Sequence, residues 1–171
     1  VFTVHGERSA RLRVEGDCAA VDGFGAGMTG GELTVEGSAG SRVGAAMSGG
    51  RIGVTGHVGD DAGVGMSGGV LRVHGNAGHR LGAATPGAAK GMTGGEIVVS
   101  GSAGADAATR ARRGLVVVAG DVGVEAARGM IAGSLVVLGR IGHGLGSGNK
   151  RGSIVSAGGV TVPSTYRYAC T

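Results

Sequence analysis

A glycine that returns with a 19-residue period constrains this chain more than any other feature. Successive glycines of this first column are one 19-residue step apart, except from Gly75 to Gly101, where a 26-residue step fits one repeat with a seven-residue insertion. A second glycine column, from Gly31 to Gly152, keeps the same register. A short, fixed period of this kind is typical of solenoids, in which each repeat packs only on its neighbours. The first column consists of Gly37, Gly56, Gly75, Gly101, Gly120, Gly139 and Gly158.

Apolar residues recur in the same register. Each repeat opens with a short segment in which apolar side chains alternate with others, as in a strand. Aliphatic columns run from Leu33 to Ile154 and from Val35 to Val137, and methionine recurs from Met28 to Met130 with Ala111 as an interruption. No segment has helical spacing, and glycine disfavours helices. The glycines are expected to mark corners where φ is positive.

These patterns predict an all-β fold: a right-handed parallel β-helix with 19-residue glycine-rich rungs, or a close relative with three short strands per turn. The chain has 41 glycines, no tryptophan and only two tyrosines and two phenylalanines, so small aliphatic side chains must fill a narrow core. We expect one β-helix domain over residues 1–158 with an insertion near 83–90, followed by a C-terminal tail over residues 159–171.

The outward positions of the repeated strand change character along the chain. They begin with Glu32, Thr34 and Glu36 and become apolar in the later repeats. A contiguous apolar patch of this size is typical of an interface. We therefore predict that another polypeptide covers it; the alternative is that the C-terminal tail folds back over it. The apolar outward positions are Val98, Leu115, Val117, Val136, Leu138 and Val155.

The positive charge is concentrated near the C-terminus. The net charge is +4, and residues 110–171 carry eight Lys/Arg against two Asp/Glu. Arg110, Arg112, Arg113 and Arg128 are candidates for contact with an anionic ligand arm, the alternatives being a solvated edge or salt bridges to a partner. Nucleic acid is not expected as a partner because no aromatic stacking groups accompany these arginines.

The sequence offers few groups for chemistry. The five histidines lie in different parts of the repeat and are expected to be ordinary exposed side chains, and Asp60 and Asp61 are expected to be solvated turn residues. Glycine-rich strings are followed by strands rather than by the helix that a phosphate loop needs. We therefore predict no catalytic and no metal-binding residue in this chain.

The expected location is the cytoplasm. Cys18 and Cys170 form no CxxC motif and are expected to be free thiols in a reducing compartment. No apolar run is long enough to span a membrane and no signal peptide is visible, so no membrane contact is expected.

One repeated unit resembles a known family. The unit Gly-Met-Thr/Ser-Gly-Gly, followed by a short strand and another glycine, begins at Gly27, Gly65 and Gly91. It resembles the glycine-rich β-helix subunit of formylmethanofuran dehydrogenase and of the related bacterial formyltransferase/hydrolase complex, over residues 12–158. The C-terminal β-helix of the glutamate synthase large subunit is a second resemblance, although Gly75–Arg80 fits its characteristic corner poorly.

The first resemblance implies a non-catalytic scaffold subunit of an enzyme complex in one-carbon metabolism. Such a complex transfers formyl from formyl-tetrahydromethanopterin to a methanofuran-type carrier and releases formate. Amidohydrolase-like and formyltransferase-like partner subunits would hold the metals and catalytic residues, and this chain would hold no cofactor. The second resemblance implies a β-helix that spaces two catalytic domains. A free-standing polysaccharide-binding β-helix would need aromatic platforms or carboxylate rows that this sequence lacks.

Overall fold

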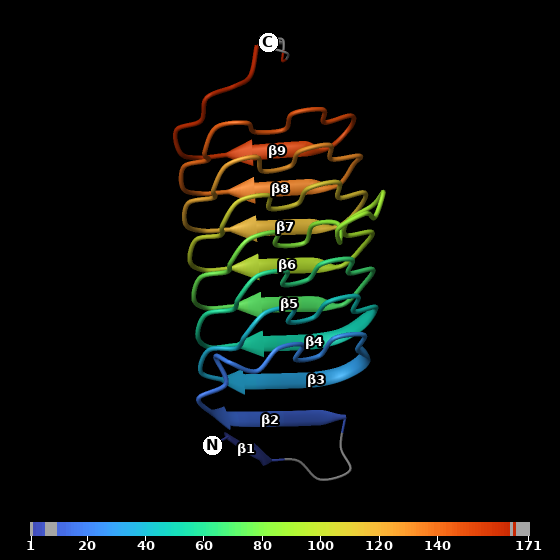
Figure 1. Cartoon of the computed structure of the whole chain (residues 1–171), viewed down its shortest axis with the longest axis vertical. Coiled ribbons are helices and arrows are strands. Elements are labelled where there is room, and N and C mark those ends of the chain that lie inside the picture. The colour runs from blue at the N-terminus through green and yellow to red at the C-terminus, as the bar shows by residue number, and fades with distance from the viewer. Residues whose placement is uncertain (1, 6–9, 165, 167–171) are drawn as a thin grey trace.

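The computed structural model describes residues 2–5, 10–164 and 166, which form a solenoid with the N-terminus at one end and the C-terminus at the other (Figure 1). One sheet holds nine strands in chain order, and no helix occurs in the part that the structure describes. The predicted all-β parallel solenoid is therefore confirmed. The strands are β1 (Phe2–His5), β2 (Arg11–Gly16), β3 (Thr29–Glu36), β4 (Gly49–Val54), β5 (Val70–Val73), β6 (Glu96–Val99), β7 (Leu115–Val118), β8 (Ser134–Val137) and β9 (Ser153–Ser156).

Parallel pairing from β2 to β9 stacks the aliphatic columns of the sequence directly on one another. The column from Leu33 to Leu135 is at most 5% exposed, and the column from Val35 to Val137 is at most 1% exposed. Buried methionines close the core at a third position. Burial of so many aliphatic groups in one narrow column is the main stabilising term, at about 25 cal/mol per Å² of apolar surface removed from water.

Each turn of the solenoid contains one strand. The related fold with three short strands per turn, which the sequence analysis also considered, is therefore not formed. The second side of the turn contributes a single parallel bridge per rung, in a column from Cys18 to Val160. The remaining side alternates left-handed residues with others, as at Gly23, Gly25 and Gly27, where φ is +77°, +65° and +70°. Since an extended strand requires negative φ, this side cannot form a ladder of strands.

The two glycine columns have different physical causes. From Gly31 to Gly133, φ lies between +82° and +100°, as expected for corners. In the first column φ is positive only at Gly37, so the expectation of left-handed corners is wrong for the rest. There, glycine is needed because successive rungs approach closely: a Cβ on Gly75 would lie 2.6 Å from the carbonyl oxygen of Gly56.

The two ends of the sheet are covered differently. Strand β1 pairs antiparallel with β2 and lies along the outer edge of the first parallel strand. At the other end, the Tyr166 hydroxyl donates a hydrogen bond to the Gly146 carbonyl at 2.9 Å. The described residues of the tail leave Leu138 and Val155 55% and 54% exposed. These described residues therefore do not cover Leu138 and Val155; residues 165 and 167–171, to which the alternative also refers, lie outside the described part of the chain.

The insertion forms a loop that protrudes from the side of the solenoid, yellow-green in Figure 1. Its two ends are tied to the next rung, because the Ala84 amide donates to the Thr109 carbonyl at 3.1 Å and the Gly91 amide donates to the Arg110 carbonyl at 2.9 Å. Within the loop, the Ala88 amide donates to the Thr85 carbonyl at 2.9 Å. The insertion is thus an ordered loop that backbone hydrogen bonds attach to the neighbouring rung.

Candidate functional site

The outward side of strands β6 to β9 carries an apolar surface, here called the apolar strand face. Parallel register stacks Val98, Val117, Val136 and Val155 in one column. The first three are half-buried against their neighbours, whereas Val155 is exposed. Exposed aliphatic groups in a contiguous column are costly in water and typical of a docking surface. The apolar strand face consists of Val98, Leu115, Val117, Val136, Leu138 and Val155.

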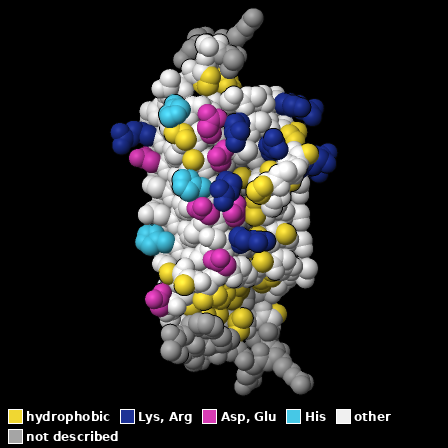
Figure 2. All heavy atoms as spheres, viewed as in Figure 1, with side chains coloured by type: hydrophobic (Ala, Val, Ile, Leu, Met, Phe, Trp, Pro, Cys, Tyr) yellow, Lys and Arg dark blue, Asp and Glu magenta, His cyan; other side chains and the backbone are white. Residues whose placement is uncertain are grey.

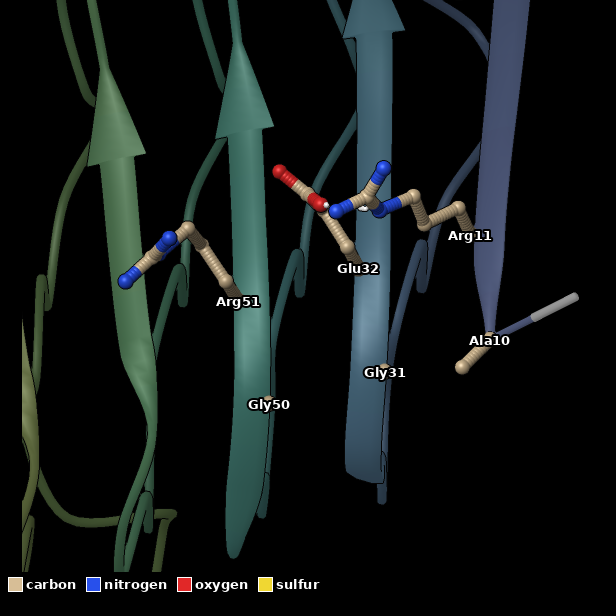
Figure 3. A pocket seen from close by; sticks show the side chains of 6 residues that line it. All are labelled: Ala10, Arg11, Gly31, Glu32, Gly50 and Arg51. Carbon is tan, nitrogen blue, oxygen red and sulfur yellow. Dashed lines mark ion pairs between the residues drawn. The ribbon is translucent and has the colours of Figure 1, made fainter.

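The same side of the solenoid is charged near the N-terminus. There Arg11 and Glu32 form an ion pair at 3.1 Å, and Arg51 follows in register on β4 (Figure 3). These residues border a hollow of about 420 Å³ whose floor includes Gly31 and Gly50. The hollow exists because glycines leave the corner without side chains. Arg11 and Arg51 are exposed and Glu32 is half-buried, so the hollow is a solvated gap between charged side chains.

The structure divides the four candidate arginines into two groups. Arg110 and Arg128 line a pocket of about 190 Å³ beneath the insertion loop. Arg112 and Arg113 are exposed at the following corner, just before β7, and do not line this pocket. Arg110, Arg112 and Arg113 are close in sequence and were therefore predicted to form one cluster. The chain turns at Ala111, and this turn separates Arg110 from the other two.

Side chains from three rungs build the pocket. Arg110 donates from Nη1 to the carbonyl of Ala88 in the loop at 2.9 Å. Arg128 Nη2 donates to Asp106 Oδ1 at 2.7 Å. Thr109, only 8% exposed, donates from Oγ1 to the same carboxylate oxygen at 3.3 Å. The loop is therefore fixed to the rung by Arg110, and Asp106 holds the opposite wall.

Charges of alternating sign follow one register position along the axis, and Figure 2 shows blue and magenta side chains gathered along the middle of this face. The position holds Arg42, Asp61, Arg80 and Asp106, all with φ near +60°. Arg80 contacts Asp61 through Nε and Nη2, both at 2.7 Å, and lies 3.7 Å from Asp60. Asp60 and Asp61 lie in a turn, as expected, but both carboxylates are ion-paired with Arg80 rather than surrounded only by solvent.

The hydrogen bond from Arg80 lowers the pKa of Asp61 below its ordinary value of 3.8, with the charges of Arg80 and Arg42 adding to the effect against the opposing effect of burial. Because the unfolded chain then takes up this proton at a higher pH than the folded chain does, Asp61 stabilises the fold above its ordinary pKa, and this contribution is lost as the pH falls through the lowered pKa. Asp61→Asn should therefore melt at a lower temperature than the unsubstituted chain at neutral pH. The difference should be smaller at about pH 2 than at about pH 7 in melting curves followed by circular dichroism.

Asparagine is a suitable replacement because it tolerates the left-handed conformation of Asp61, whose φ is +62°. An equal gap between the two melting temperatures at both pH values would contradict the assigned role of the ion pair.

A ladder of side-chain acceptors also links the rungs, and our interpretation of the histidines missed it. At the position after the first glycine column, the side chains of five successive rungs each accept a hydrogen bond from the backbone N–H of the next rung, at 2.7–3.1 Å. His57 Nδ1 is one acceptor; at a different position, His79 Nδ1 accepts from Ala105 at 3.0 Å. The signal was present in the sequence, because acceptor side chains occupy this position in five successive rungs before Arg140 ends the series. The accepting side chains are Ser38, His57, Asn76, Ser102 and Asp121.

No group of three or more His, Cys, Asp or Glu side chains is placed to hold a metal ion among the residues that the structure describes. In the same part of the chain, no helix has the length and apolar character needed to cross a membrane.

A chain of known structure is similar to this one along almost all of its length. It belongs to the formyltransferase/hydrolase complex (FhcABCD) from Methylorubrum extorquens, whose X-ray crystal structure contains methylofuran. The two chains share 37% sequence identity and superpose with a TM-score of 0.88. The match covers 95% of this chain and 61% of the other. No family model and no curated protein matches the sequence. The resemblance drawn from the glycine-methionine unit is thus confirmed for this complex.

Proposed function

We propose, from its similarity to a chain of the formyltransferase/hydrolase complex, that this protein is a non-catalytic scaffold subunit of such a complex. The complex would transfer formyl from formyl-tetrahydromethanopterin to a methanofuran-type carrier and release formate. Formyltransferase-like and amidohydrolase-like partner subunits would supply the catalytic residues and metals. This chain spans only 61% of the chain that it matches, so the proposal concerns the solenoid that the two share.

The observation that carries the proposal is the apolar strand face. A stack of rungs that repeats the same backbone makes an extended surface along the axis of the solenoid. On this surface Leu138 and Val155 remain more than half exposed. The charged side chains at the same outward positions near the N-terminus, including Glu32 and Arg51, make that end a polar rim. An apolar patch bordered by charged residues is the usual anatomy of a protein–protein interface.

Lysine at both Val117 and Val136 should prevent this assembly without unfolding the chain. Both side chains point outward, so the new ammonium groups stay solvated in the free chain but would be buried unpaired in the interface. A loss of about 3 kcal/mol in binding corresponds to about 100-fold weaker association. We would express the tagged chain in its source cells, purify it at low salt and analyse the co-purified subunits by native mass spectrometry.

Thr34→Lys with Gly53→Lys is the matched control, because these residues occupy the same outward column in two adjacent rungs near the N-terminus. The control should retain its partners. Intact assembly in the valine variant would exclude the apolar strand face as the interface. Recovery of the unsubstituted chain without formyltransferase-like or amidohydrolase-like subunits would contradict the proposed complex itself.

A further inference from the structure

We propose that the pocket beneath the insertion loop binds a carboxylate group of an acidic ligand, with Arg110 as its main contact. The pocket is built entirely from this chain, so the proposal does not rest on the scaffold role. Its walls are the loop residues Thr85–Gly87, the charged side chains of Arg80, Asp106 and Arg128, and Arg110.

The loop that roofs the pocket is the one departure from the 19-residue period in the glycine columns. The repeat does not need it, since the rungs before and after close without it. The loop is nevertheless held in place at both ends and through its middle by the hydrogen bond from Arg110 Nη1 to the Ala88 carbonyl at 2.9 Å. Because the loop is fixed over charged side chains, it roofs a hollow between itself and the rungs.

Arg110 is unusual for its position in the repeat. Its backbone is left-handed, with φ of +56°. A residue with a Cβ is strained in this conformation relative to glycine. Arg42 and Arg80 share the conformation at another position of the repeat. Other rungs have small residues at the equivalent position: glycine at Gly27, Gly65, Gly129 and Gly148, Ala46 with a left-handed φ of +55°, and Ala84, whose φ is not positive.

Charge in the pocket is balanced everywhere except at Arg110. Arg128 is paired with Asp106 at 2.7 Å and lies 3.6 Å from Glu125. Arg80 is paired with Asp61 at 2.7 Å. Among the described residues, no carboxylate forms an ion pair with Arg110, whose one side-chain hydrogen bond goes to a neutral carbonyl. The donors of the paired arginines are partly occupied, whereas Arg110 retains free donors for a ligand.

The geometry favours a single carboxylate over phosphate. Guanidinium groups bind carboxylates through two parallel hydrogen bonds. Because Asp106 neutralises Arg128 and Asp61 neutralises Arg80, Arg110 is left as one uncompensated positive charge, which a singly charged anion balances. A volume of about 190 Å³ holds about six waters at roughly 30 Å³ each, enough for a carboxylate on a short methylene chain. A glutamate side chain has these properties.

The test is titration of the 171-residue chain with N-acetyl-glutamate amide, with N-acetyl-glutamine amide as its neutral isostere, followed by NMR of the arginine side chains at low salt. Only the glutamate probe should bind. Arg110→Ala should weaken binding by about tenfold or more, as expected for loss of charge-assisted hydrogen bonds. Ala46 shows that alanine is accepted at this backbone position, with φ of +55°.

Arg112→Ala is the matched control, because it removes the same charge at an exposed site outside the pocket, and it should change binding by less than about twofold. Deletion of residues 84–90, which restores the 19-residue period, should also abolish binding while Arg110 stays in place. Equal weakening by the two alanine variants, equal binding of the glutamine probe or tighter binding of inorganic phosphate would each overturn the proposal. Melting temperatures of all variants would verify that each is folded.

Discussion

Gly75→Ala is expected to destabilise the solenoid by about 3 kcal/mol, at the upper end of the usual cost of overpacking. A Cβ at this position would lie 2.6 Å and 2.7 Å from the carbonyl oxygen and carbon of Gly56, and 2.8 Å from His57 Nδ1. The first two are backbone atoms, so relief requires the two rungs to separate. Separation would lengthen the hydrogen bond from the Gly75 amide to the Gly56 carbonyl, now 2.9 Å.

Gly53→Ala is the control for this prediction. Gly53 lies in β4, and a Cβ there would meet no atom within 4 Å. Alanine should be neutral or stabilise the chain by up to about 1 kcal/mol, because it reduces the freedom of the unfolded chain. Chemical denaturation of the three proteins measures both effects. Similar midpoints for Gly75→Ala and Gly53→Ala would show that close approach of the rungs is not what requires glycine in the first column.

Leu71→Ala should cost about 2–5 kcal/mol, the usual range for a fully buried leucine. Leu71 is 0% exposed and stacks between Ile52 and Ile97 in the middle of the solenoid. The rungs are held at a fixed spacing by their backbone hydrogen bonds, so they cannot collapse into the cavity. Because coupling between repeats is local, the loss should also weaken the link between the two halves and broaden the unfolding transition.

Leu138→Ala provides the comparison, since it deletes the same atoms from a side chain that is 55% exposed. Its cost should stay within about 0.5 kcal/mol. Thermal and denaturant unfolding of both variants would measure the two losses in the free energy of unfolding. A large loss for Leu138→Ala in the free chain would mean that the apolar strand face contributes to folding and not only to docking.

Most of the fold was predictable because equivalent positions of successive repeats must be buried or exposed in the same way, so each repeat confirms the pattern of the others. The aliphatic columns through Leu71 and Val73 are buried as their spacing indicated. The apolar strand face was also predicted to point outward, and its residues do so. Its role as an interface remains a prediction.

The candidate site was predictable only in part. Arg110 and Arg128 were singled out by charge, but their shared pocket depends on Arg80 and Asp106, which the sequence analysis did not connect with them. The 26-residue step marked the insertion without indicating that the loop turns back onto Arg110. The histidine acceptors were missed because chemistry was sought at metal or catalytic sites, whereas the register links His57 to the backbone of the next rung.

By itself, the sequence determined the parallel stacking, the composition of the core and the outward apolar column. All three follow from periodicity, because residues at the same position of a stacked repeat must face the same environment. Only the tertiary structure decided that one strand, not three, forms in each turn, because φ at Gly23, Gly25 and Gly27 depends on the path of the chain between rungs. It also decided which arginines meet: side-chain distances across rungs and beneath an aperiodic loop are not encoded by any period.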